Sequence, residues 1–162
     1  MNQIKITIPL PTHIRKTANK VKADKYVKIN NQLIYQGVNH FTRAIIVTNL
    51  HAHISEEINP EFKNLKIDSN NIRLLYEFYT VINHSTARKT AKGISWNPAK
   101  KDYSPDWDLD NLADLWSKAG NDTLVLEGVI KDDNVGFVKE ETTRFIEINE
   151  LYDARIELTI NY

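Results

Sequence analysis

Two short acidic motifs in the second half of the chain have the residue types and spacing of metal ligands. Asp108 and Asp110 stand two positions apart, just before a segment of helical periodicity that begins near Asn111. In an extended backbone residues i and i+2 point to the same side, so both carboxylates would face one spot. Carboxylates so close repel each other unless a cation lies between them. Mg²⁺ prefers such oxygen ligands and also binds phosphate oxygens and water.

A second acidic pair, Asp132 and Asp133, follows the apolar residues Val129 and Ile130. If these apolar residues are buried beside the preceding helix, the pair emerges at the same end of the sheet as the first motif. Each motif also has an ordinary explanation. The first could be a helix N-cap followed by a solvated turn residue, and the second could be a turn before a strand. A metal site requires that both motifs converge.

Opposite charges are concentrated in different parts of the chain, although the net charge is zero. Up to Tyr103 there are 16 Lys and Arg against 7 Asp and Glu, and after it 5 against 14. This asymmetry indicates a polyanion-binding part joined to an acidic site. The alternative is that both parts fold together and their charges intermix on one surface. The candidates for contacts with nucleic-acid phosphates are Arg15, Lys16, Lys20, Lys22, Arg88, Lys89, Lys92, Lys100 and Lys101.

The length and composition favour a single domain over residues 1–162 with its own hydrophobic core. No apolar stretch reaches the roughly 18 residues of a membrane helix, so we expect no membrane partner. The absence of cysteine excludes disulfides and thiolate metal sites, and the cytoplasm is the expected location. No phosphate-binding glycine loop and no nucleophile elbow is found in the sequence.

Hydrophobic periodicity predicts an α+β fold with a small mixed sheet and two main helices. The predicted strands are Ile4–Leu10, Ile72–Thr80, Val135–Ile148 and Ala154–Ile160, with a short hairpin over Tyr26–Tyr35. The predicted helices are Val38–Ile54, ending before Pro60, and a second helix from Asn111 that Gly120 stops, followed by a short turn or helix over Thr123–Glu127. Two segments without periodicity, Thr12–Lys28 and Asn83–Trp107, are expected to be loops.

The acidic motifs also carry a resemblance to a known family. Asp108-Leu-Asp-Asn-Leu, a helix and then Gly128-Val-Ile-Lys-Asp-Asp resemble the D-x-D-N-L motif and the later D-D pair of the RusA family of Holliday-junction resolvases. Ile4–Pro11 and Arg155–Ile160 are similar to the first and last strands of that family. The resemblance covers most of the chain, but its specific part runs from Asp108 to Asp133.

The resemblance implies a RusA-like fold and a Mg²⁺-dependent homodimer that binds and nicks four-way DNA junctions in recombination and repair. Mn²⁺ is expected to substitute for Mg²⁺. Such proteins are typically encoded by phages and prophages and would act in the cytoplasm of a bacterial host. The implied catalytic carboxylates are Asp108, Asp110 and Asp133, with Asp132 beside them as a further metal ligand.

The sequence departs from the family pattern in two places. The family has a lysine four positions after its second motif aspartate, where this chain has Asp114. Lys118, one turn further along, could replace that lysine, or it could form an ordinary surface pair with Asp114. The long segment Asn83–Trp107 is the second departure. Two alternatives therefore remain: a branched-DNA-binding protein of weak or no activity, and a Mg²⁺ nuclease that prefers flaps or forks.

Overall fold

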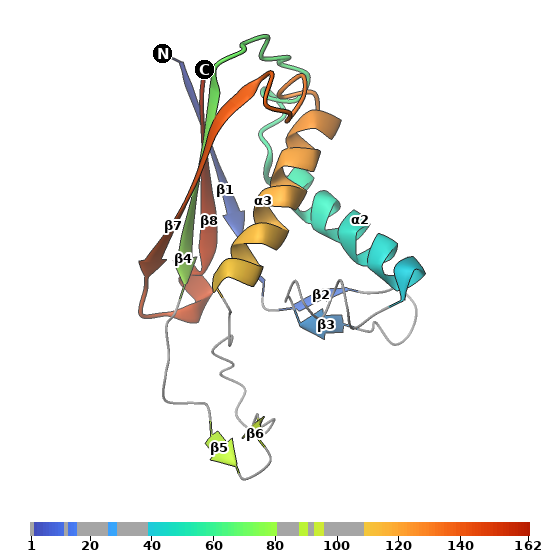
Figure 1. The fold of residues 1–162 in the computed structure, drawn as a ribbon, viewed down its shortest axis with the longest axis vertical. Coiled ribbons are helices and arrows are strands. Elements are labelled where there is room, and N and C mark those ends of the chain that lie inside the picture. Colours follow the sequence, from blue (N-terminus) through green and yellow to red (C-terminus); the bar gives the residue numbers. More distant parts are fainter. Residues whose placement is uncertain are drawn as a thin grey trace.

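A computed structural model describes residues 2–11, 13–15, 26–28, 39–80, 88–90, 93–95 and 109–162. The short strands and the first turn of the second main helix are described by their backbone alone. Figure 1 shows one sheet with both main helices on the same face, and both termini at the same end of that sheet. Within these residues no helix is both long and apolar enough to cross a membrane.

The main sheet has four strands in the order β1-β8-β4-β7. Its strands are β1 (Gln3–Pro9), β8 (Arg155–Asn161), β4 (Ile72–Thr80) and β7 (Val138–Glu147). The pairs β1–β8 and β8–β4 are antiparallel and the pair β4–β7 is parallel. With the helices α2 (His40–Glu57) and α3 (Leu109–Leu126), this mixed sheet confirms the predicted α+β fold.

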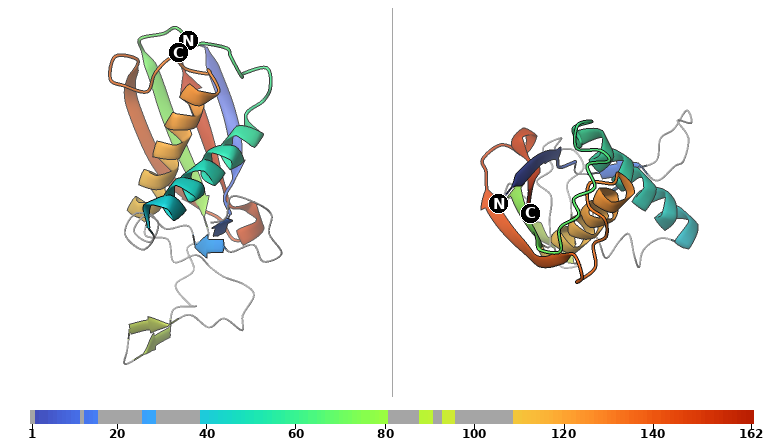
Figure 2. Two further views of the ribbon diagram at one scale, coloured as in Figure 1. Left: turned by 90° about the vertical axis from the view of Figure 1, so that its right-hand side faces the viewer. Right: turned by 90° about the horizontal axis from the view of Figure 1, so that it is seen from above.

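Alternation along β1 and β4 directs one row of side chains toward the two helices, whereas the central strand β8 is buried on both faces. In β4, for example, Ile72, Leu74, Tyr76 and Phe78 are all buried. Turned by 90°, the molecule shows α2 and α3 crossing over the sheet (Figure 2). The helices bury the faces expected from their periodicity, with Ile46, Leu50 and Ile54 from α2 and Leu112, Leu115, Trp116 and Ala119 from α3.

Four short strands lie in the two segments that were expected to be loops. β2 (His13–Arg15) pairs with β3 (Tyr26–Lys28), and β5 (Arg88–Thr90) pairs with β6 (Gly93–Ser95). The loop predictions are wrong at β2, β5 and β6, because a backbone ladder forms there without apolar alternation in the sequence. A strand at Tyr26–Lys28 was expected as part of a hairpin, but it pairs with β2. The hairpin predicted over Tyr26–Tyr35 depends on residues 29–38, which lie outside the described part of the chain.

Asn39 caps α2, because its side-chain oxygen accepts a hydrogen bond from the Thr42 backbone N–H at 3.0 Å. The helix extends to Glu57, three residues beyond the predicted end, and stops before Pro60. A 3₁₀ turn, η1 (Leu151–Asp153), joins β7 to β8.

Gly120 does not stop α3, contrary to the prediction. The helix continues to Leu126, and Gly128, with φ at +66°, follows its end in the left-handed region that glycine tolerates. Gly120 has a packing role instead: a Cβ atom placed on it would lie 2.5 Å from the Tyr76 hydroxyl oxygen. The missing side chain therefore lets the helix lie close to β4.

We expect Gly120→Ala to destabilise the protein by about 1–3 kcal/mol, because the added methyl overlaps the buried Tyr76 side chain. This would outweigh the helix propensity of alanine, which favours it over glycine by about 1 kcal/mol. Urea unfolding measures the change. In a Tyr76→Phe background, which removes the overlapping oxygen, the same substitution should cost much less. An equal cost in both backgrounds would contradict the steric explanation.

Candidate functional site

The first turn of α3 contains one of the predicted carboxylate residues. Leu109 begins the helix and Asp110 is its second residue. A helix N-terminus leaves backbone N–H groups without helical partners and carries a partial positive charge, which favours anionic groups there. Asp108 and the side chain of Asp110 lie outside the described part of the chain. The structure thus places Asp110 inside the first turn of α3, whereas an extended segment ending before Asn111 was predicted, so the extended-backbone argument does not hold for Leu109 and Asp110.

The second acidic pair lies in the connection from α3 to β7. Val129 and Ile130 are buried, as expected, and Ile130 forms a parallel bridge with Ile67. The Asp132 carboxylate accepts a hydrogen bond from the Asn134 backbone N–H at 3.0 Å. This is the turn role considered as the alternative for the pair. Asp133 is exposed, and within the described residues its carboxylate forms no hydrogen bond or ion pair.

A chain of hydrogen bonds joins the sheet interior to the edge strand near this connection. The Tyr76 hydroxyl donates to the Asn121 side-chain oxygen at 2.7 Å. The amide nitrogen of Asn121 in turn donates to a Glu141 carboxylate oxygen on β7 at 2.7 Å. Burial raises the pKa of Tyr76 well above its ordinary value, and the carboxylates of Glu141, Asp133 and Asp122 raise it further. Asp133 therefore lies within electrostatic reach of this buried hydroxyl.

Along α3, Asp110 lies at a different level from the Tyr76 hydroxyl, whose pKa the Asp133 carboxylate raises. The Tyr76 hydroxyl contacts the helix at Ser117 and Asn121. At about 1.5 Å per residue, Asp110 lies roughly 10–16 Å from these residues along the helix axis. That the carboxylates of both motifs bind one cation stays a prediction, because Asp108 and the side chain of Asp110 lie outside the described part of the chain.

Thr80 is a candidate residue that the sequence reasoning did not single out. It ends β4 on the side that faces the helices, and it is 1% exposed. Its hydroxyl has no hydrogen-bond partner in the part of the chain that the structure describes. The sequence contained one signal, a polar residue at a position where the alternation of β4 demands an apolar one.

These residue types fit a hard divalent cation. The candidate carboxylates and the unpaired Thr80 hydroxyl offer oxygen atoms only, which is the donor set that Mg²⁺ and Mn²⁺ prefer. Among the described side chains, no group of three or more His, Asp or Glu residues lies close enough to hold a metal ion. A complete ligand set would therefore need Asp110 or Asp108.

Asp114 and Lys118 are both exposed on α3. No ion pair between these two described side chains is present, so the surface pair considered for them does not form. Lys118 lies two helical turns after Asp110, roughly 12 Å along the axis. It is closer to the level of Tyr76 than to the first turn of the helix.

The predicted phosphate-binding residues fall mostly outside the described part of the chain. Arg15 is in β2, and Arg88 and Lys89 are in β5, each described by its backbone only. The remaining members lie outside the described residues altogether: Lys16, Lys20, Lys22, Lys92, Lys100 and Lys101.

The two histidines of α2 have different partners, as expected for residues two apart on a helix. His51 lies 3.7 Å from the Asp122 carboxylate on α3, whereas His53 donates to the Pro9 carbonyl oxygen at 2.8 Å. Burial lowers the pKa of His51, and Asp122 partly opposes this shift. The two side chains therefore do not form a shared metal site.

Comparison with known proteins does not extend the resemblance. No protein-family model matches the chain, and no curated protein matches it. The resemblance to the RusA family therefore rests on the sequence motifs alone.

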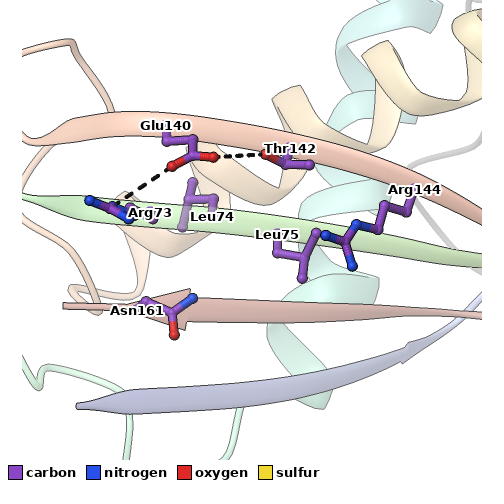
Figure 3. Close-up of a pocket in the computed structure, with 7 residues that line it drawn as sticks. All are labelled: Arg73, Leu74, Leu75, Glu140, Thr142, Arg144 and Asn161. Carbon is purple, nitrogen blue, oxygen red and sulfur yellow. Dashed lines mark hydrogen bonds and ion pairs between the residues drawn. The ribbon is translucent and has the colours of Figure 1, made fainter. Parts of the chain in front are cut away.

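The face of the sheet opposite the helices has a shallow hollow of about 200 Å³ (Figure 3). Arg73 and Arg144 lie on opposite sides of Leu75, and Asn161 completes the lower side. Arg73 pairs with Glu140 at 3.7 Å. This hollow is separated from the acidic connection by the sheet, so it is not part of the candidate metal site.

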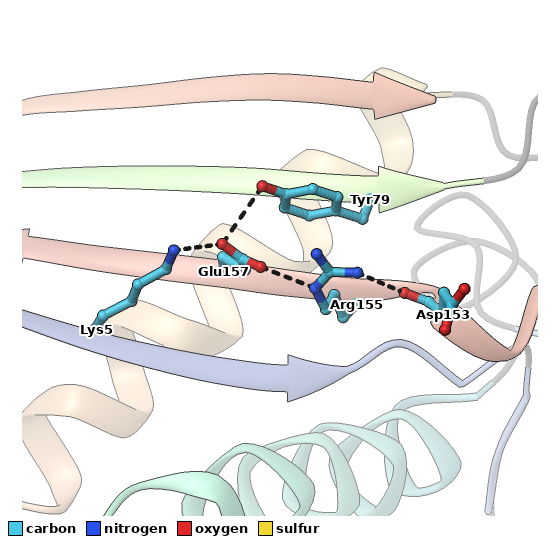
Figure 4. A network of polar contacts seen from close by, with 5 residues as sticks. All are labelled: Lys5, Tyr79, Asp153, Arg155 and Glu157. Atoms are coloured by element: carbon cyan, nitrogen blue, oxygen red, sulfur yellow. Dashed lines mark hydrogen bonds and ion pairs between the residues drawn. The ribbon is translucent and has the colours of Figure 1, made fainter. Parts of the chain in front are cut away.

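Glu157 is the centre of a polar network on the same outer face (Figure 4). Its carboxylate pairs with Lys5 of β1 and with Arg155 of its own strand, and it accepts a weak hydrogen bond from Tyr79 at 3.4 Å. The Arg155 guanidinium also lies over the Tyr79 ring, 3.8 Å from its centroid. The hydrogen bond from Lys5 and, to a lesser degree, Arg155 lower the pKa of Glu157 below 4.5, against the effect of burial.

This pKa direction predicts how the stability depends on pH. A carboxylate with a lowered pKa in the folded state stabilises the protein above about pH 4.5, and that contribution is lost as the pH falls through the lowered value. Glu157→Gln should therefore lower stability by about 1–2 kcal/mol at pH 7, and by progressively less below pH 4.5. Urea unfolding between pH 7 and pH 3 measures the difference.

Glu140→Gln is the matched control, because Glu140 is exposed and its 3.7 Å pair with Arg73 is worth about 0–1 kcal/mol. A Glu157→Gln effect that stays constant across this pH range would contradict the assignment.

Proposed function

We propose that this protein is a Mg²⁺-dependent endonuclease that cuts branched DNA, with four-way junctions as its substrate. The observation that carries the proposal is the position of the D-x-D-N-L motif. Asp110 of this motif is the second residue of α3, and Asp132 and Asp133 follow the other end of the same helix, after the buried Val129 and Ile130. The two acidic motifs that resemble those of the RusA family thus lie before and after one helix, which supports the proposal.

In this proposal Asp108, Asp110 and Asp133 bind the cation, and Asp132 supports the turn that carries Asp133. A bound Mg²⁺ would supply Lewis-acid polarisation of the phosphodiester and lower the pKa of water. The protein orients the carboxylates by fixing α3 against β4 through Tyr76 and Gly120. Lys118 provides a positive charge on the same helix for a substrate phosphate.

The proposed partner is branched DNA bound by a homodimer, because a two-fold axis places two sites on equivalent strands of a junction. The basic clusters around Arg15 and Arg88 would neutralise phosphates of the arms. The proposed setting is the cytoplasm of a bacterial host, with a gene of phage or prophage origin.

A second candidate function is branched-DNA binding with little or no cleavage. It is favoured by Asp114, which stands where the family has a lysine and is exposed without an ion pair to Lys118. A carboxylate there would oppose rather than assist a phosphate.

The decisive variant is Asp110→Asn, assayed on a synthetic four-way junction with Mg²⁺. We expect cleavage to fall by on the order of 100-fold or more, because a group that stabilises the reacting phosphate is lost. Junction binding in a gel-shift assay should persist, since one negative charge facing DNA is removed. Asp122→Asn is the control: it makes the same charge change on α3, at a residue that faces His51. Undiminished cleavage by Asp110→Asn would exclude the metal mechanism at this helix.

The relative rates of cleavage of different DNA substrates distinguish the proposed junction nuclease from the two alternatives. The wild-type protein should cut a junction faster than a flap, a replication fork or linear duplex of the same sequence. A shifted junction band without product over a range of Mg²⁺ and Mn²⁺ concentrations would support the binding protein instead. Faster cutting of flaps or forks would identify a nuclease of different preference.

A further inference from the structure

The hollow on the outer face of the sheet contains a cationic side chain that is not paired within the described part of the chain (Figure 3). Arg144 of β7 forms no hydrogen bond or ion pair with any residue that the structure describes. Glu77 of β4 is its register partner, yet no ion pair joins these two described side chains. A guanidinium has five N–H donors and no acceptor. The hollow therefore presents a set of unpaired donors.

The side-chain acceptors around the hollow, by contrast, already have donors. One oxygen of the Glu140 carboxylate lies 3.7 Å from Arg73 Nε, and the other accepts a hydrogen bond from the Thr142 hydroxyl at 3.3 Å. The side-chain oxygen of Asn161 accepts a hydrogen bond from the Gln3 amide at 3.4 Å. Within the described residues, this leaves the amide N–H groups of Asn161 and the terminal amino groups of Arg73 unpaired. A ligand that supplies acceptor oxygens would complement these donors.

The size and floor of the hollow suit a small anionic group. Its volume of about 200 Å³ exceeds the roughly 30 Å³ that one water molecule occupies in the liquid. It is smaller than the roughly 300–1,000 Å³ of pockets that enclose a drug-sized ligand. The half-buried side chain of Leu75 forms an apolar floor. Such a floor limits the approach of water from below, which strengthens charge-assisted hydrogen bonds at the rim.

We propose that this hollow binds a phosphate group, either of a free phosphate compound or of a nucleic-acid strand. Arg73 and Arg144 lie on opposite sides of Leu75, and Asn161 lies on a third side (Figure 3). Donors from three neighbouring strands match an anion whose oxygen atoms point in several directions, and arginine binds phosphate through paired N–H groups. The site goes beyond the proposed nuclease activity and does not depend on it, because the sheet separates the hollow from the helices.

The test is a titration of the wild-type protein and of Arg144→Gln with inorganic phosphate at constant ionic strength, followed by the NMR shifts of the backbone amides. In the wild type, the amides of Leu75, Thr142 and Asn161 should shift and reach saturation with phosphate but not with chloride. Arg144→Gln should bind about 10-fold more weakly, because a charge-assisted hydrogen bond is lost. Arg144→Lys should recover only part of the affinity, because an ammonium lacks the paired donors.

Two further variants separate the site from general effects of charge and folding. Lys66→Gln removes the same charge from the connection between α2 and β4, where the Lys66 backbone N–H donates to the Gly128 carbonyl oxygen at 2.8 Å. It should bind phosphate as the wild type does. Glu140→Gln should bind phosphate several-fold more tightly, because it removes a negative charge from the rim and releases Arg73. Thermal unfolding checks that each variant is folded.

The source of the phosphate group is identified with a deoxynucleoside monophosphate and a single-stranded oligodeoxynucleotide. If Arg144→Gln weakens the binding of inorganic phosphate or of the monophosphate, the site accepts a free phosphate compound. If it weakens the binding of the oligonucleotide alone, the ligand is a strand. In that case the slope of log affinity against log salt should also fall by about 0.7, as expected for the loss of one phosphate contact. Either outcome supports the site.

The phosphate site is overturned if Arg144→Gln binds all three probes as tightly as the wild-type protein does. Weaker phosphate binding by Glu140→Gln would also overturn it, because a carboxylate at the rim of an anion site can only oppose the ligand. The junction-cleavage assay of Asp110→Asn is independent of these titrations. A failure of the proposed nuclease activity therefore leaves the phosphate site standing, and the reverse also holds.

Discussion

The close approach of α3 to β4 is the constraint on which the rest of the structure depends. Tyr76 is fully buried, and its hydroxyl occupies the space that a side chain at position 120 would need. The helix can lie at this distance only with glycine there, and the hydrogen bond from Tyr76 to Asn121 fixes its position along the strand. Every candidate residue on α3, from Asp110 onward, takes its place relative to the sheet from this contact.

The two faces of the sheet differ in the contacts that stabilise them. The face that the helices cover contains the core. Near the C-terminal ends of the two helices, the Ser55 hydroxyl donates to the Glu127 carboxylate at 2.6 Å. The Lys63 ammonium contacts both of these side chains. The open face contains the Glu157 network instead. The described ionic contacts thus stabilise the outer face of the sheet and the C-terminal ends of the two helices.

Part of the architecture follows from local pattern. The alternation over Ile72–Thr80 matches β4 at both ends, and the burial of Val129 and Ile130 was expected from their apolar character. The sequence pattern failed at the short strands and at Gly120. The β2–β3 and β5–β6 ladders have no alternation to reveal them, and Gly120 has the sequence signature of a helix end although it lies within α3.

The sequence by itself determined the mixed α+β class, the core-facing rows and the presence of two acidic motifs on either side of one helix. These features depend on periods of two and about 3.6 residues, which are local. Only the tertiary structure decided that Gly120 accommodates Tyr76, that Asp132 supports a turn, that the Asp133 carboxylate raises the pKa of Tyr76 and that the Thr80 hydroxyl has no partner among the described residues. The physical reason is that each of these facts is a contact between segments far apart in the chain, and such contacts follow from how a helix and a strand pack against each other.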